Sequence, residues 1–148
     1  MNALKSKRMI KPQLSSNVQA FIDALINIAP QPDSIWLIGS QANGRATENS
    51  DTDILVFGTP EFYRKVQEEI TAPIQIDCLI VQDGNHYQDP WQEKSGSIER
   101  LKWHRVTDVL AEYIGSKWEP DEESSIECNA EMGELKEPRE SALRVWPF

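Results

Sequence analysis

Apolar residues in the first part of the chain recur every three or four positions, which is the spacing of one helical face. The residues with this spacing are Val18, Phe21, Ile22, Leu25 and Ile26. Ser15 or Ser16 offers an N-cap before them, and Pro30 ends the pattern. The spacing therefore predicts a first helix that starts near Val18.

Three apolar runs that follow are too short for helices and are typical of buried strands. They are residues 34–39, 52–57 and 74–81, bounded by turn-forming residues such as Pro32 and Gly58. Between the second and third runs, Phe62, Val66 and Ile70 lie four apart and predict a helix over 61–70. This alternation gives the order helix, strand, short helix, strand, helix, strand.

The last third of the chain divides into a helical pattern and an acidic stretch. Trp103, Val106, Leu110, Tyr113 and Ile114 predict a last helix over the sheet that ends near Gly115, after a loop at 86–96. Residues 119–140 are acidic and show no sustained period. We therefore expect one domain at 1–118 and an acidic tail or extension at 119–148. Its apolar residues Leu143, Val145, Trp146 and Phe148 either dock back or bind a partner.

Composition and charge narrow the classes of function. The 148 residues are 39% hydrophobic and 26% charged, as in globular proteins, with a net charge of −9 that works against nucleic-acid binding. The cluster Lys5, Lys7, Arg8 and Lys11 reads as a solvated arm. No apolar run approaches the roughly 20 residues of a membrane span, and the start lacks a secretory pattern, so we expect a cytoplasmic protein. Cys78 and Cys128 have no zinc-type spacing and are expected to be inert thiols, and we assign no role to His86 or His104.

Candidate chemistry begins at Gly39-Ser40, where a buried strand passes into the small-residue turn 41–44. If this turn starts a helix, its backbone N–H groups form an anion site. Gly39 lets a phosphate approach the backbone, and the Ser40 hydroxyl can donate a hydrogen bond. A Gly-Ser pair after a strand is also an ordinary turn, so the pair does not decide the function alone.

Three aspartates supply candidate metal ligands. Asp51 and Asp53 lie two apart at a strand start, so both point to one face and suit a hard cation such as Mg²⁺. The alternative is a solvated strand entrance with two surface acids. Asp77 is a lone acid in an apolar strand, where it requires a metal or a cation such as Arg45 or Lys65.

These segments together resemble the DNA polymerase β-like nucleotidyltransferase superfamily, and in particular its minimal stand-alone members. That family carries Gly-Ser, ten intervening residues, Asp-x-Asp and a third Asp from a later strand. Here residues 41–50 intervene between Ser40 and Asp51, and Asp77 follows. The sequence departs from the family at Gln41 and Asn43, where many relatives carry Arg, and at Thr52, where an aliphatic residue is usual.

The resemblance implies an α+β fold with a small mixed sheet and helices packed mainly on one face. Its expected activity is Mg²⁺-dependent transfer of a nucleoside monophosphate, with AMP from ATP as the first expectation. Asp51, Asp53 and Asp77 would hold two Mg²⁺ ions, and Gly39 and Ser40 would hold the β- and γ-phosphates. It also implies a HEPN-type protein partner, as in adenylylating antitoxins, and an oligomer or hetero-complex. The alternative is a non-catalytic module that keeps this fold and binds a protein through its acidic or apolar C-terminal residues.

Overall fold

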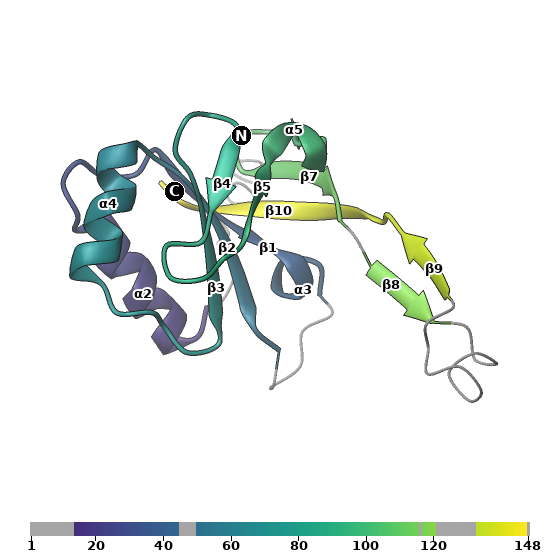
Figure 1. Ribbon diagram of the computed structural model, residues 1–148, viewed down its shortest axis with the longest axis horizontal. Helices are drawn as coiled ribbons and strands as arrows, with labels where there is room; N and C mark the ends of the chain where they lie inside the picture. Colours follow the sequence, from purple (N-terminus) through teal and green to yellow (C-terminus); the bar gives the residue numbers. More distant parts are fainter. Residues whose placement is uncertain (1–13, 45–49, 116, 121–132, 148) are drawn as a thin grey trace, which may run out of the picture.

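The computed structural model describes residues 14–44, 50–115, 117–120 and 133–147. It contains an eight-stranded sheet, a separate two-stranded hairpin and helices packed against the larger sheet (Figure 1). The strands of the larger sheet are β1 (Ser34–Ile38), β2 (Thr52–Phe57), β3 (Ile76–Val81), β4 (His86–Gln88), β5 (Ser95–Ser97), β6 (His104–Arg105), β7 (Leu110–Ile114) and β10 (Arg139–Trp146). The hairpin pairs β8 (Lys117–Pro120) with β9 (Gly133–Lys136).

The strand order in the larger sheet is β5-β4-β3-β2-β1-β10-β7-β6. β2 and β3 run parallel, and the other neighbouring strands run antiparallel, so the sheet is mixed. The parallel pair is joined through a helix, as a parallel crossover requires. The predicted α+β class with a mixed sheet is therefore confirmed.

The described residues include the helices α2 (Ser16–Ile26), α3 (Gly39–Ala42), α4 (Pro60–Glu69) and α5 (Ile98–Leu101) among these strands. α4 shows how local sequence sets a boundary. The hydroxyl of Thr59 accepts a hydrogen bond from the Phe62 N–H at 3.1 Å, and Pro60 occupies the first turn, where it costs no backbone hydrogen bond. No helix in the described part of the chain is long and apolar enough to cross a membrane.

One side of the sheet, which we call the helix face, is covered by α2 and α4, seen together at the left of Figure 1. Phe21, Ile22 and Leu25 of α2 and Phe62 and Val66 of α4 are buried there. They pack on alternate residues of the central strands: Ile35, Leu37, Ile54, Val56, Cys78 and Ile80. The helices predicted at 18–26 and 61–70 are confirmed, as is their common face.

The opposite side, which we call the aromatic face, has a different cover. Its buried residues include Trp36, Leu55, Leu79 and Tyr113. Partly buried residues that pack on them include Phe57, Tyr87 and Trp103 together with Ile98 and Leu101 of α5. Trp103 meets Trp36 edge-on at 5.2 Å between ring centroids and stacks on Tyr113 at 6.3 Å. This face is therefore closed by aromatic rings and a short helix.

The helix predicted between Trp103 and Gly115 is wrong. α5 is a single short turn that ends at Leu101, and the next residue, Lys102, caps it with a left-handed φ of 53°. β7 then alternates between buried and half-buried residues, because Ala111 and Tyr113 pack on the aromatic face. β7 pairs along its whole length with β10, about thirty residues later, and this non-local pairing overrides the helical spacing.

Within the stretch expected as a tail, β10 lies inside the sheet, between β1 and β7. Leu143 pairs with Leu37 of β1, and Val145 is buried under the helices. Of the two expectations for the apolar C-terminal residues, docking back is therefore the one that the structure shows for Leu143, Val145 and Trp146. Phe148 lies outside the described residues, and so do Cys128 and the basic cluster Lys5, Lys7, Arg8 and Lys11.

Candidate active site

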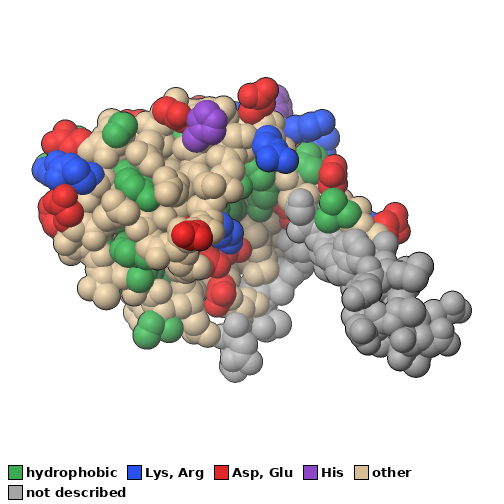
Figure 2. All heavy atoms as spheres, in the orientation of Figure 1, with side chains coloured by type: hydrophobic (Ala, Val, Ile, Leu, Met, Phe, Trp, Pro, Cys, Tyr) green, Lys and Arg blue, Asp and Glu red, His purple; other side chains and the backbone are tan. Residues whose placement is uncertain are grey.

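Two aspartates from neighbouring parallel strands face each other at one end of the aromatic face. β2 and β3 pair in a register that sets Asp53 opposite Asp77. Each is followed two residues later by a residue of the aromatic face, Leu55 or Leu79, so both carboxylates project to that side. Figure 2 shows acidic side chains gathered over these strands, with a basic side chain next to them.

The Asp53–Asp77 pair changes the acidity of Asp53. Burial, the charge of Asp77 and a hydrogen bond with Asp77 together raise the pKa of Asp53 to about 6. The ammonium group of Lys94 lowers the pKa of Asp53, and the charge of Asp51 raises it by a smaller amount. Two carboxylates this close hold an excess of negative charge, and a cation between them relieves it.

Gly39 is the residue that makes room for Asp53. Its φ of 72° is in the left-handed region that favours glycine. A Cβ on Gly39 would collide with the Oδ2 atom of Asp53, so the Asp53 carboxylate rests directly against this backbone. The Gly39 N–H donates to the Tyr113 hydroxyl at 2.9 Å, which links the end of β1 to β7.

Asn43 holds the turn after β1 against β10. Its Nδ2 donates to the carbonyls of Gly39 at 2.8 Å and Ser141 at 3.2 Å, and its Oδ1 accepts from the Ser141 N–H at 2.9 Å. The side chain at this position, where many relatives carry Arg, is thus engaged with protein backbone. Asn43, at which the sequence departs from the family pattern, therefore has a structural role.

The other predicted site residues are placed as follows. Ser40 is half-buried in α3, next to Gly39, so the predicted turn and helix start are at the expected place. Asp51 is exposed, just before β2, and its charge contributes to the raised pKa of Asp53. Within the described ranges, no three His, Cys, Asp or Glu side chains converge as a metal cluster. The structure thus joins Asp53, Asp77 and Gly39 closely, and the three-carboxylate metal site stays a prediction.

Of the two cations considered as partners for Asp77, Lys65 contacts a different group. Lys65 lies on α4, which covers the helix face, and its Nζ donates to the Ala29 carbonyl at 2.5 Å. Arg45 lies outside the described residues. Lys94, at the end of the β4–β5 loop, is the cation that interacts with this pair through Asp53. Sequence reasoning missed Lys94, because it belongs to no motif and only the loop conformation brings it here.

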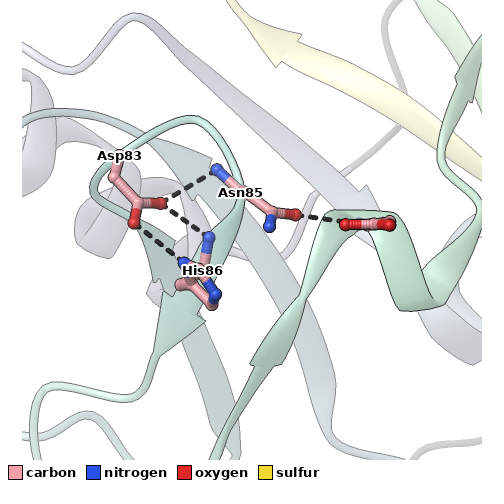
Figure 3. Close-up of polar contacts among 4 residues, drawn as sticks. Asp83, Asn85 and His86 are labelled. Atoms are coloured by element: carbon pink, nitrogen blue, oxygen red, sulfur yellow. Dashed lines mark hydrogen bonds and ion pairs between the residues drawn. The ribbon is translucent and has the colours of Figure 1, made fainter.

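The remaining reactive side chains have structural roles. Asp83 Oδ1 accepts from the N–H groups of Asn85 and His86 at 3.0 and 2.7 Å, and its Oδ2 lies 2.9 Å from His86 Nδ1 (Figure 3). These bonds lower the pKa of Asp83 and fix the turn between β3 and β4. Cys78 is buried on the helix face, where burial raises the pKa of its thiol, as expected for an inert cysteine.

Two cavities lie along the β4–β5 hairpin, which replaces part of the loop predicted at 86–96. One, of about 380 Å³, is lined mainly by polar residues such as Gln82, His86 and Arg100. The other, of about 290 Å³, extends from Tyr87 and the Ser95–Ser97 strand to Ile114. None of the described residues Asp53, Asp77 and Gly39 lines either cavity, so the cavities are separate from the carboxylate pair.

A comparison with protein-family models decides the family. The model described as a nucleotidyltransferase domain matches residues 18–137, which is most of the chain and spans every predicted site residue. The chain belongs to this nucleotidyltransferase family. The chain has no match among curated proteins or among solved structures.

Membership of the nucleotidyltransferase family supports transfer of a nucleoside monophosphate from a nucleoside triphosphate. Such domains generally use a divalent metal ion, and the residues present fit one. The two facing carboxylates offer hard oxygen donors, and a cation between them would relieve their mutual repulsion. Because Gly39 has no side chain, the Asp53 carboxylate lies directly against the turn after β1.

Proposed function

We propose that this nucleotidyltransferase domain is an Mg²⁺-dependent enzyme that moves a nucleoside monophosphate from a nucleoside triphosphate to an acceptor. The observation that carries the proposal is the register of β2 and β3, which sets Asp53 opposite Asp77 next to Gly39. The family supports the reaction class, and the facing carboxylates support the choice of metal.

The proposed roles follow from the positions of the side chains. Asp53 and Asp77 would hold the metal with Asp51, which completes the set from the entrance of β2. Bound Mg²⁺ supplies charge neutralisation on the triphosphate and activation of the acceptor nucleophile. In the transfer, the acceptor oxygen bonds to the α-phosphorus, the bond from that phosphorus to the bridging oxygen breaks, and pyrophosphate leaves.

The turn after β1 would bind the phosphates. Because the Gly39 N–H donates to Tyr113, the donors that we assign to phosphate are the Ser40 hydroxyl and the backbone N–H groups that follow it. Asn43 keeps these donors in place through its bonds to Gly39 and Ser141. Fixed donors favour in-line attack because no reorganisation is needed as the reaction proceeds.

ATP is the nucleotide to test first, with AMP as the transferred group, and a protein is the acceptor that we favour. The net charge of −9 works against an RNA acceptor, which needs clustered cations. A HEPN-type partner in an antitoxin-like complex is the candidate that the superfamily resemblance offers. Co-expression with such a protein, followed by mass spectrometry with and without Mg²⁺ and ATP, tests this acceptor.

The decisive experiment is calorimetric titration of a non-hydrolysable ATP analogue, with and without Mg²⁺. The wild type is expected to bind only with metal, and Asp53→Asn/Asp77→Asn is expected to lose this binding. Asp23→Asn serves as the matched control, because it makes the same chemical change on an exposed position of α2. If no nucleoside triphosphate analogue binds the wild type under any metal condition, the catalytic proposal is rejected and the binding-module alternative gains support.

A further inference from the structure

The backbone of Gly39 is held at both of its polar groups. Its N–H donates to the Tyr113 hydroxyl at 2.9 Å, and its carbonyl accepts from the Asn43 side chain at 2.8 Å. Glycine has access to more backbone conformations than other residues, so a defined position for Gly39, at its φ of 72°, depends on such contacts. The Asp53 carboxylate lies against Gly39, and Ser40 follows it in the chain. The groups that hold Gly39 therefore also place the start of the proposed phosphate-binding turn.

Tyr113 reaches Gly39 from a distant part of the chain. The two residues are 74 positions apart in the sequence. β10 lies between β7 and β1 in the sheet, so the Tyr113 side chain crosses one strand to reach the end of β1. The β10 residue in the same core cluster is Ala142, whose small side chain leaves room for this crossing. A hydroxyl at the far end of a rigid ring can make such a contact, whereas a serine hydroxyl would be too short.

The ring of Tyr113 is fixed by its neighbours. Tyr113 is 7% exposed and stacks on Trp103 at 6.3 Å between ring centroids. Trp103 in turn meets Trp36 of β1 edge-on at 5.2 Å. The pairing of β7 with β10 fixes the Tyr113 backbone. The hydroxyl that accepts from Gly39 is therefore held in place by the core of the aromatic face.

We propose that Tyr113 is a positioning residue for nucleotide transfer, which holds the turn after β1 in the conformation that binds the triphosphate. The inference rests on the proposed function and deepens it, because it extends the substrate site to β7. The Tyr113 hydroxyl acts through Gly39 and does not touch the nucleotide. It keeps the Ser40 hydroxyl and the N–H groups that follow in place before the substrate arrives, which lowers the entropy cost of ordering them on binding.

The test compares Tyr113→Phe with two matched controls, Tyr63→Phe and Tyr87→Phe, each of which also removes one tyrosine hydroxyl. The Tyr63 hydroxyl donates to the Asp89 carbonyl at 3.3 Å, and the Tyr63 ring belongs to the core of the helix face. Tyr87 packs on the same aromatic face as Tyr113. Calorimetry with Mg²⁺ measures the affinity for the non-hydrolysable ATP analogue, inorganic tripolyphosphate and AMP, and thermal unfolding measures the stability of each variant.

Without the Tyr113 hydroxyl, the Gly39 N–H loses its partner, and the turn rearranges to satisfy it. Tyr113→Phe should therefore weaken binding of the ATP analogue and of tripolyphosphate by about 3- to 10-fold, the range for one lost hydrogen bond between neutral groups. AMP binding should change little, because the turn is assigned to the β- and γ-phosphates. Tyr63→Phe and Tyr87→Phe should keep the wild-type affinity for all three probes. Amide hydrogen exchange at Gly39 should be faster in Tyr113→Phe than in either control.

Unchanged affinity of Tyr113→Phe for both triphosphate probes overturns the assignment and leaves the proposed function intact, whether or not the melting temperature falls. Tighter binding also overturns it, because the Gly39 N–H would then bind phosphate better without Tyr113. An equal loss of affinity in Tyr63→Phe overturns it as well, because the effect would then follow from stability. If the wild type binds neither tripolyphosphate nor any nucleoside triphosphate, the proposed function and this inference are both overturned.

Discussion

The two faces of the sheet differ in how far apart in the sequence their residues lie, although they share the same central strands. The helix face is formed mainly by segments close in sequence, since α2 and α4 flank β1 and β2 along the chain, and the more distant β10 adds Val145. The aromatic face takes Tyr113 from β7, Ala142 from β10 and Trp103 from the turn after α5, all far from β1. The helix face serves mainly stability, and the aromatic face combines a core with the carboxylate pair.

If this division is right, substitutions on one face should change stability and those at the carboxylate end of the other should change chemistry. Asp53 and Asp77 are partly exposed and repel each other, so they contribute little to stability. Leu25 and Phe62 are fully buried and belong to the core of the helix face. The following predictions test the division, beginning with the largest expected effect.

Asp53→Asn should reduce transfer by about 1,000-fold, while the fold remains intact. Loss of a metal ligand removes several kcal/mol of charge stabilisation in the transition state, and roughly 1.4 kcal/mol corresponds to each tenfold change in rate. Steady-state rates with Mg²⁺, beside circular dichroism spectra, measure both effects. Transfer at the wild-type rate by a folded Asp53→Asn protein would remove Asp53 from the catalytic set.

Leu25→Ala should lower the free energy of unfolding by about 3 kcal/mol, as for other fully buried leucines, without changing nucleotide affinity of the folded protein. Urea denaturation gives the stability, and calorimetry at a temperature where the variant is folded gives the affinity. Ala20→Ser, at an exposed position of α2, is the control and should stay within about 0.5 kcal/mol of the wild type. A large loss of affinity in Leu25→Ala would show that the two faces are coupled.

Gly39→Ala should be more harmful than Gly44→Ala. Both glycines have a φ of 72°, so alanine at either costs about 1 to 2 kcal/mol for the left-handed backbone. The added Cβ meets the Asp53 carboxylate at Gly39, whereas at Gly44 it meets no atom of the described residues within 4 Å. The difference between the variants in unfolding free energy and in Mg²⁺-dependent nucleotide affinity therefore isolates the contact with Asp53. Equal effects would mean that the carboxylate moves aside at no cost.

Local pattern was sufficient to predict much of the helix face. Phe21 and Leu25 or Phe62 and Val66 show helical spacing, and the strands they cover are short apolar runs. The motif spacing also brought Asp53, Asp77 and Gly39 to one place, because strand alternation and the β2–β3 register follow from the same segments. These parts depend on short sequence separations.

The remaining parts depend on pairing that no local pattern encodes. Leu110 to Ile114 fits a helical stripe as well as a strand, and only the partner strand β10 decides between them. β10 itself contains Arg139, Glu140 and Arg144, so its polar character concealed an inner strand. Lys94 and Tyr113 reach the site through a loop and a distant strand, and their roles required the tertiary structure.

The smallest predicted effect is a dependence of stability on pH in metal-free buffer. Burial and Asp77 raise the pKa of Asp53 from 3.8 to about 6, so between these values the folded state keeps a proton that the unfolded chain releases. Its contribution to the free energy of unfolding is therefore full below pH 4 and is lost as the pH rises through 6. Because Asp53 is partly solvent-exposed, we expect a loss of about 1 kcal/mol, or about 2 to 4 °C in melting temperature.

Asp53→Asn removes this titration, so the wild type should become less stable relative to the variant as the pH rises from 4 to 7. The comparison cancels other titrating groups such as Asp83, whose pKa is lowered and whose effect has the opposite sign. Mg²⁺ should reverse the difference at pH 7, because a ligand that binds only the folded wild type stabilises it. The prediction fails if the difference in melting temperature between the wild type and Asp53→Asn is the same at every pH, with and without Mg²⁺. That result would contradict both the close approach of Asp77 to Asp53 and the metal site proposed on it.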